Sequence, residues 1–173
     1  MSLDTHTGRL RAFAHPLRLR IMSVLTGEAG SAAEVARRIG CTQANASYHI
    51  RVLHAAGLLQ VVERTSVRGG QAVRYQHHPL SGEQVKAGGQ EGYELLAEAM
   101  AEELRRRSSL RERNVPGVVT DAELHVRPAD WAAFLVTVGA AARRLHACAR
   151  PAGSPGTIRT STTIAAFRMR KGQ

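Results

Sequence analysis

The sequence predicts a mainly α chain with a small β component, an α+β class built in three parts. Apolar residues recur at helical spacing in two short segments between residues 31 and 57, and a basic, β-branched stretch follows them. A long amphipathic stretch begins at residue 91, and an alternating run occupies residues 157–168. The expected units are an N-terminal unit, residues 1–79; a linker and long helix, residues 80–116; and a C-terminal α/β unit, residues 117–173.

The first of the two short helices is expected to begin at Ser31 and to end at Gly40. Ser31 and Glu34 have the spacing of a capping box, in which each side chain accepts a hydrogen bond from the other residue's backbone. Gly40 can adopt the left-handed backbone that ends many helices. One face of this helix is apolar: Ala32, Val35, Ala36 and Ile39.

The second short helix is expected to begin after Thr42, which can cap it, and to end at Gly57. Three residues form its core face: Ala46, Ile50 and Leu53. Six residues at its start lie on other faces: Gln43, Ala44, Asn45, Ser47, Tyr48 and Arg51. Polar side chains at the start of the second helix of such a pair are what reading base edges requires.

A two-stranded hairpin is predicted after these helices. Residues 58–64 are apolar and β-branched, Gly69-Gly70 marks a turn, and residues 72–76 alternate as a return strand. Three arginines, Arg64, Arg68 and Arg74, make this wing basic and suited to phosphates. Two helices and a glycine alone are typical of ordinary core packing, but with the wing they predict a winged helix-turn-helix that binds double-stranded DNA.

Several segments resemble the ArsR-like winged-helix transcriptional regulators. They are HPLRLRI at residues 15–21, EVA at 34–36, TQANASYHIRVL at 42–53 and AGLL at 56–59. The resemblance covers roughly residues 6–79. It implies a dimeric repressor on a near-palindromic operator, with Gln43, Asn45, Ser47 and their neighbours reading bases and the wing following phosphates.

One departure from this family concerns metals. Metal-sensing members carry paired cysteines in the first helix of the helix-turn-helix, where this chain has Ser31 and Ala33. Neither residue can bind a soft metal as a thiolate does, so no metal sensor is expected at that position.

The charge of the chain favours a polyanionic partner. The 173 residues carry a formal net charge of +10 and have a pI of about 11.1. The charge is +6 over residues 1–78, −3 over residues 79–130 and +7 over residues 131–173, where no acid occurs. The basic end is interpreted as a solvated face, with an additional DNA-backbone contact as the alternative.

Neither a disulfide framework, a metal site nor an enzyme is expected. Cys41 and Cys148 lie far apart, and Cys41 is interpreted as a small filler rather than a reactive thiol. His77 and His78 are adjacent and should point to opposite sides of a strand, while His146 and Cys148 are two residues apart on a helix. No phosphate loop, nucleophile elbow or zinc-protease motif occurs, so no cofactor is expected either.

A cytoplasmic protein without membrane segments is expected. The start of the chain has Asp4 and no apolar run of the kind that a signal peptide needs. The longest apolar stretch, residues 131–142, is too short to span a bilayer.

A supporting helix should precede the helix-turn-helix, with Pro16 at its first position. Its core face consists of Leu17, Ile21, Val24 and Leu25. Arg18 and Arg20 are expected elsewhere on the surface, and residues 10–14 are expected to form an earlier short helix.

The middle of the chain predicts a strong helix over residues 91–113, after a glycine-containing linker. An apolar stripe runs along it: Tyr93, Leu96, Met100 and Leu104. Since a narrow stripe on a long helix indicates packing against another helix, dimerisation is favoured over a place in the core of the same chain.

The tail is predicted to be a strand at residues 123–127, a helix from Pro128 and a strand at residues 157–168. One broad face of the helix is apolar: Trp131, Phe134, Leu135, Val138, Ala142 and Leu145. Too few elements are present to bury one another, so the tail should pack on the middle helix, the DNA module or a dimer mate. Its hypothetical function is to sense a small-molecule effector or to bind a partner, and Trp131 is interpreted as core rather than as a pocket wall.

Two functions therefore follow from the sequence. The first is an operator-specific transcriptional regulator, a repressor released by a signal that acts on the tail. The alternative is a nucleic-acid-associated interaction module whose basic surfaces bind DNA with little sequence preference while its tail recruits another protein.

Overall fold

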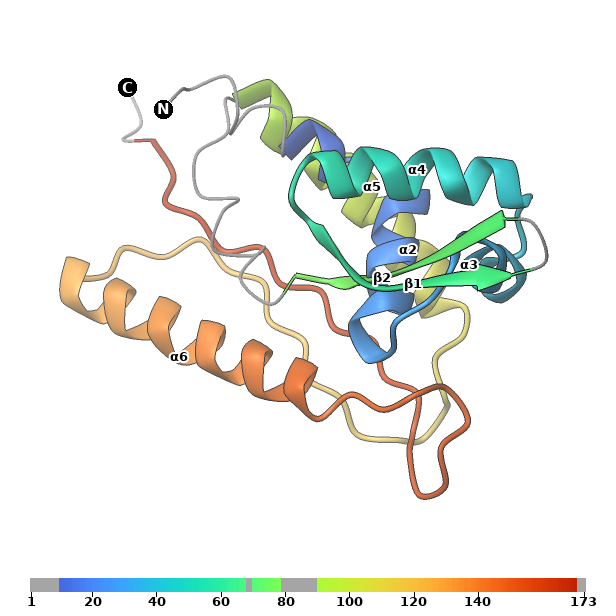
Figure 1. Ribbon diagram of the computed structural model, residues 1–173. Coiled ribbons are helices and arrows are strands. Elements are labelled where there is room, and N and C mark those ends of the chain that lie inside the picture. Colours follow the sequence, from blue (N-terminus) through green and yellow to red (C-terminus); the bar gives the residue numbers. More distant parts are fainter. Residues whose placement is uncertain (1–9, 68–69, 79–89, 171–173) are drawn as a thin grey trace.

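A computed structural model describes residues 10–67, 70–78 and 90–170 of the chain. Residues 10–13 are helical, as predicted. Figure 1 shows the labelled elements, whose order along the chain is α2 (Pro16–Gly27), α3 (Ala32–Ile39), α4 (Gln43–Ala55), β1 (Leu59–Val67), β2 (Gly70–His77), α5 (Gln90–Ser108) and α6 (Pro128–Ala147). Helices predominate and the described strands form one antiparallel pair, which confirms the predicted mainly α class with a small β component.

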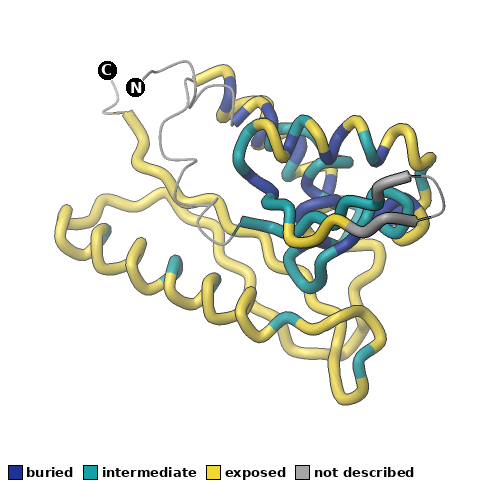
Figure 2. Tube along the Cα trace, viewed as in Figure 1, coloured by how far each residue is buried: buried dark blue, intermediate teal, exposed yellow. Residues whose placement is uncertain are grey.

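The main core lies between α2, α3, α4 and the start of β1. Figure 2 shows the buried part of the chain concentrated in these elements. The largest fully buried side chains of this core are Ile21, Leu25, Val35, Ile50, Leu53 and Leu58. The predicted apolar faces of the two short helices are therefore the faces that pack, because burying them removes the most apolar area from water.

Two arginines of α2 are less exposed than predicted. Nη2 of Arg20 donates to the carbonyl oxygen of Ile39 at 2.6 Å, and Nη2 of Arg18 donates to the carbonyl oxygen of Arg11 at 3.0 Å. Both side chains thus bind the backbone of neighbouring elements, and Arg20 satisfies a carbonyl at the C-terminal end of α3.

A second apolar cluster joins α5 to α2. Its buried members are Leu10, Leu19, Leu96 and Ala99. Of the predicted stripe on this helix, Leu96 is buried, but Tyr93 is 38% exposed and Leu104 is 50% exposed. One face of α5 therefore packs within its own chain, and the neighbouring apolar face remains open.

The end of α5 is earlier than predicted, at Ser108 instead of residue 113. The hydroxyl of Ser108 donates to the carbonyl oxygen of Arg105, and that of Ser109 donates to the carbonyl oxygen of Arg106, both at 2.8 Å. Serine hydroxyls that occupy the last helical carbonyls favour termination of the helix.

The hairpin has the predicted antiparallel pairing. Leu59 lies opposite His77, and the register shifts between Val61 and Glu63. Gly30 extends the pairing toward the helices, since its N–H donates to the carbonyl oxygen of Tyr75 and its own carbonyl accepts from Tyr75, both at 2.9 Å. The wing is therefore attached by its backbone to the segment between α2 and α3.

The predicted tail strands at residues 123–127 and 157–168 are wrong. Neither segment pairs with another strand, and the side chains of both are exposed. In the described part of the tail, regular structure is limited to α6 and to short turns near residues 151–157. Alternation of side chains shows which faces a strand would have, but a strand also needs a neighbour for its backbone hydrogen bonds. The glycine-containing linker predicted before α5 lies mostly outside the described residues.

No helix in the described part of the chain has the length and apolar character needed to cross a membrane.

Candidate nucleic-acid interface

Capping interactions define both ends of α3 and the start of α4. Ser31 and Glu34 form the predicted capping box at the start of α3. Gly40 has φ 71° and ends that helix, and the Thr42 side chain accepts a hydrogen bond from the backbone N–H of Asn45 at 3.2 Å. These caps fix the direction in which α4 leaves the turn, so the two helices hold one relative orientation.

The predicted reading face of α4 is open to solvent. Thr42, Gln43, Ala44, Asn45, Tyr48 and Arg51 are exposed, and Ser47 is half-buried. Tyr48 is 57% exposed, which is unusual for an aromatic side chain without a partner surface. Beneath this face, Ala46, Ile50 and Leu53 anchor the helix in the core.

A histidine pair that no sequence pattern indicated lies beneath α4. His49 is 8% exposed, and its ring lies 4.6 Å from that of His15, measured between centroids. Burial, followed by the nearby His15 and Arg18, lowers the pKa of His49. Burial and Arg18 likewise lower the pKa of His15, although Glu102 opposes them. Both rings therefore favour the neutral form.

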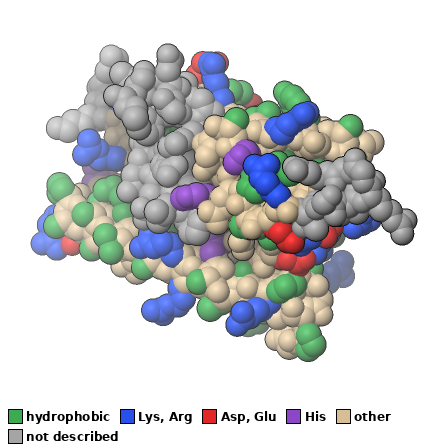
Figure 3. Space-filling view, in the orientation of Figure 1, with side chains coloured by type: hydrophobic (Ala, Val, Ile, Leu, Met, Phe, Trp, Pro, Cys, Tyr) green, Lys and Arg blue, Asp and Glu red, His purple; other side chains and the backbone are tan. Residues whose placement is uncertain are grey.

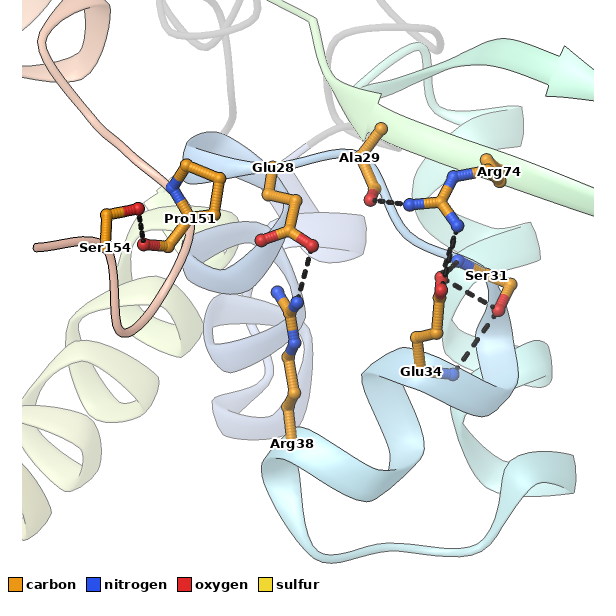
Figure 4. Close-up of polar contacts among 8 residues, drawn as sticks. All are labelled: Glu28, Ala29, Ser31, Glu34, Arg38, Arg74, Pro151 and Ser154. Carbon is orange, nitrogen blue, oxygen red and sulfur yellow. Dashed lines mark hydrogen bonds and ion pairs between the residues drawn. The ribbon is translucent and has the colours of Figure 1, made fainter.

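The three wing arginines differ in their surroundings. Arg64 on β1 is exposed, and Arg68 lies outside the described residues. Arg74 on β2 points inward instead, because its Nη2 donates to the carbonyl oxygen of Ala29 at 2.6 Å and its Nη1 donates to Glu34 (Figure 4). Arg74 therefore supports the wing from within the domain, and Arg64 is the exposed one of the two described wing arginines.

The basic residues are spread over the surface. On the face drawn in Figure 3, arginine side chains lie over both the helix-turn-helix region and α6. An ion pair joins α3 to the end of α2: Nη2 of Arg38 lies 2.6 Å from Oε1 of Glu28 (Figure 4). That ion pair occupies Arg38 within the protein.

The apolar face of α6 does not form the buried core that was predicted for Trp131. Trp131 is only half-buried and stacks on Phe134, with ring centroids 5.6 Å apart. His146 lies 6.0 Å from His77, again between ring centroids, so the end of α6 touches the end of β2. Burial and the neighbouring His146 and His78 lower the pKa of His77 to about 4.

Residues 13–62 match a protein-family model that is described as a helix-turn-helix domain. The matched segment contains α2, α3, α4 and the start of β1, which is the unit that holds the open face of α4. The chain carries a DNA-binding helix-turn-helix domain. The match covers less than half of the chain and leaves α5, α6 and the tail outside it, and no curated protein matches the sequence significantly.

Proposed function

We propose that this protein is a sequence-specific transcriptional regulator that acts as a homodimeric repressor on a near-palindromic operator. The observation that carries the proposal is the open face of α4, where Gln43, Asn45 and Arg51 are exposed on a helix whose other face is anchored in the core. Amide and guanidinium groups in this position can form bidentate hydrogen bonds with base edges in the major groove.

The wing supports the same orientation on DNA. Arg64 is exposed on β1, next to the helix-turn-helix, and can neutralise a backbone phosphate while α4 enters the groove. Since Arg74 holds β2 against α3, the wing and the reading helix approach DNA as one body.

A dimer follows from the geometry of operators. One recognition helix per chain reads one half-site, and two half-sites one helical turn apart require two chains related by a two-fold axis. The resemblance of residues 6–79 to ArsR-like repressors supports this arrangement. The places of that family's paired cysteines are taken here by Ser31, whose hydroxyl caps α3, and by Ala33, so we propose no metal response at this position.

The experiment is a genome-wide footprint of the purified full chain on fragmented DNA from its source at two salt concentrations. A specific repressor is expected to enrich an inverted repeat that survives the higher salt concentration. Uniform binding that disappears with salt would instead indicate phosphate contacts alone and favour the interaction-module alternative.

Two variants make this test residue-specific. Asn45→Ala and Arg51→Ala are expected to reduce the preference for the enriched site over a scrambled site by about 1–3 kcal/mol while leaving non-specific binding largely intact. Arg159→Ala, which removes an exposed tail charge outside the domain, is the matched control and should keep the preference.

A further inference from the structure

Helix α6 is ordered over twenty residues and yet has no buried side chain. Figure 2 shows it as an almost entirely exposed rod beside the body of the protein. Phe134 and Leu145 are each 45% exposed, and Leu135 is 43% exposed. Trp131, Val138 and Ala142 are half-buried by their own chain. A 20-residue helix with apolar side chains this open gains little from packing in its own chain, and a partner that covers them would explain its amphipathic sequence.

The apolar residues of α6 follow the spacing of a helix-pairing seam. Trp131, Leu135, Val138, Ala142 and Leu145 are separated by four, three, four and three residues. This alternation places them along one line of the helix that can face a second helix over its whole length, about 30 Å. Val136 lies on the opposite side and is 69% exposed.

The seam is complementary to itself when two copies run antiparallel. The bulky Trp131 and Leu135 lie in its first half, and the small Ala142 lies in its second half, before Leu145 at the end. An antiparallel pair centred between residues 136 and 137 sets Trp131 of one chain against Ala142 of the other, and Leu135 against Val138. Large residues facing small ones allow the two helices to interdigitate without voids or clashes. A parallel pair would instead set Trp131 against Trp131.

Charge favours the same orientation. Asp130 lies near the start of α6, is half-exposed and pairs with Arg127 of its own chain at 2.7 Å, while Arg144 lies in the last turn and is exposed. The antiparallel pair brings Asp130 of one chain within about one turn of Arg144 of the other, on the same edge of the interface. It also places each helix N-terminus beside a C-terminus, which suits the two helix dipoles.

We propose that α6 is a dimerisation helix that pairs in antiparallel fashion with α6 of a second copy of this chain. This inference deepens the proposed function, because it names the surface through which the repressor dimer forms. The apolar face of the partner's α6 covers Trp131, Leu135 and Val138.

The oligomeric state of the full chain without DNA tests the proposal. Sedimentation equilibrium is expected to show a dimer, and emission from Trp131, the one tryptophan of the sequence, should shift to shorter wavelength as protein concentration rises. Val138→Glu is expected to give a monomer with unchanged helicity by circular dichroism. Val136→Glu introduces the same charge on the other side of α6 and should remain a dimer.

A second, milder variant guards against loss of folding. Leu135→Ala keeps helix propensity and is expected to raise the dimer dissociation constant by about tenfold or more. The proposal is overturned if the dimer dissociation constant is the same as that of the wild type in both Leu135→Ala and Val138→Glu.

Cysteine cross-linking distinguishes the orientation of the two helices. In a background of Cys41→Ser and Cys148→Ser, a chain with Leu135→Cys is mixed with a differently tagged chain with Val138→Cys. The antiparallel pair predicts mainly mixed disulfides between the two chains. Mainly like-with-like disulfides would indicate parallel helices and contradict the proposal.

The outcomes separate this inference from the proposed function. If Val138→Glu stays dimeric and still enriches an inverted repeat, another surface such as the open face of α5 forms the repressor dimer and the inference about α6 fails alone. If the wild-type chain is monomeric at all concentrations, with no shift in Trp131 emission, the α6 proposal fails and the footprint decides separately whether DNA is read specifically.

Discussion

Arg74 on the wing binds both carboxylate oxygens of Glu34 on α3, with its Nη1 2.8 Å from Oε1 and 2.9 Å from Oε2. Glu34 also accepts from the backbone N–H of Ser31 at 2.7 Å, so one carboxylate caps α3 and holds the hairpin (Figure 4). This arrangement makes the start of the helix-turn-helix and the position of the wing mutually dependent.

Removing this contact should destabilise the domain. Arg74→Ala is expected to lower the free energy of unfolding by about 1–3 kcal/mol, because Glu34 and the carbonyl of Ala29 lose charge-assisted hydrogen bonds. Chemical denaturation measures this change. Arg64→Ala, on the exposed part of the wing, is the control and should stay within about 0.5 kcal/mol of the wild type. Equal stability of the two variants would show that the Arg74 contact contributes little.

Acid should weaken the same contact. The backbone N–H of Ser31 is the largest influence lowering the pKa of Glu34 to about 2; burial opposes it, and hydrogen bonds from Arg74 and Ser31 add to it. Because this pKa lies below its ordinary value of 4.5, the contribution of Glu34 to stability is present above pH 4.5 and is lost as the pH falls toward about 2. Between pH 5 and pH 2, the free energy of unfolding should decrease less with falling pH for Glu34→Gln than for the wild type. Equal slopes for the two proteins would contradict this prediction.

The histidine pair beneath α4 predicts a second pH dependence. Since burial lowers the pKa of His49 and of His15 below 6.5, the unfolded chain binds protons first as the pH falls below about 6.5. The free energy of unfolding should therefore decrease in that range. His49→Asn is expected to reduce this decrease, and His125→Asn, at an exposed position, should leave it unchanged. Identical pH profiles for all three proteins would contradict the prediction.

The wing should contribute affinity without sequence preference. Arg64→Ala is expected to weaken binding to specific and scrambled DNA alike and to reduce the slope of log K against log salt by about 1, as for the loss of one phosphate contact. Fluorescence anisotropy at four salt concentrations measures both quantities. Arg74→Ala has no such direct contact to lose, so its salt slope should stay nearer that of the wild type.

A buried carboxylate should stabilise the end of α5. Glu103 has a side chain only 2% exposed and lies 2.7 Å from Nη2 of Arg106 and 3.4 Å from Nε of Arg107. Burial alone would raise its pKa, but these two arginines lower it. Glu103→Ala is expected to cost about 1–3 kcal/mol of unfolding free energy, since both arginines lose a charged partner. Glu98→Ala, at an exposed position of the same helix, should have a small effect in the same thermal or chemical melts.

Local signals in the sequence determined the caps, the core faces and the exposed face of α4 in the helix-turn-helix. Ser31 with Glu34, Gly40 and Thr42 act through neighbours a few residues away, so their roles could be predicted without knowledge of the fold. Apolar spacing likewise identified Ile50 and Leu53 as core, because the period of a helix decides which side chains share a face.

Only the tertiary structure decided the roles that depend on distant partners. Arg74 became a support of the wing because folding places Glu34, forty residues earlier, beside it. His49 became a buried ring because α2 brings His15 against it. The tail strands failed for the same reason, since alternation at residues 157–168 cannot create the neighbouring strand that its backbone requires. Sequence patterns report what a segment can bury or bind, and which groups satisfy it depends on the arrangement of the whole chain.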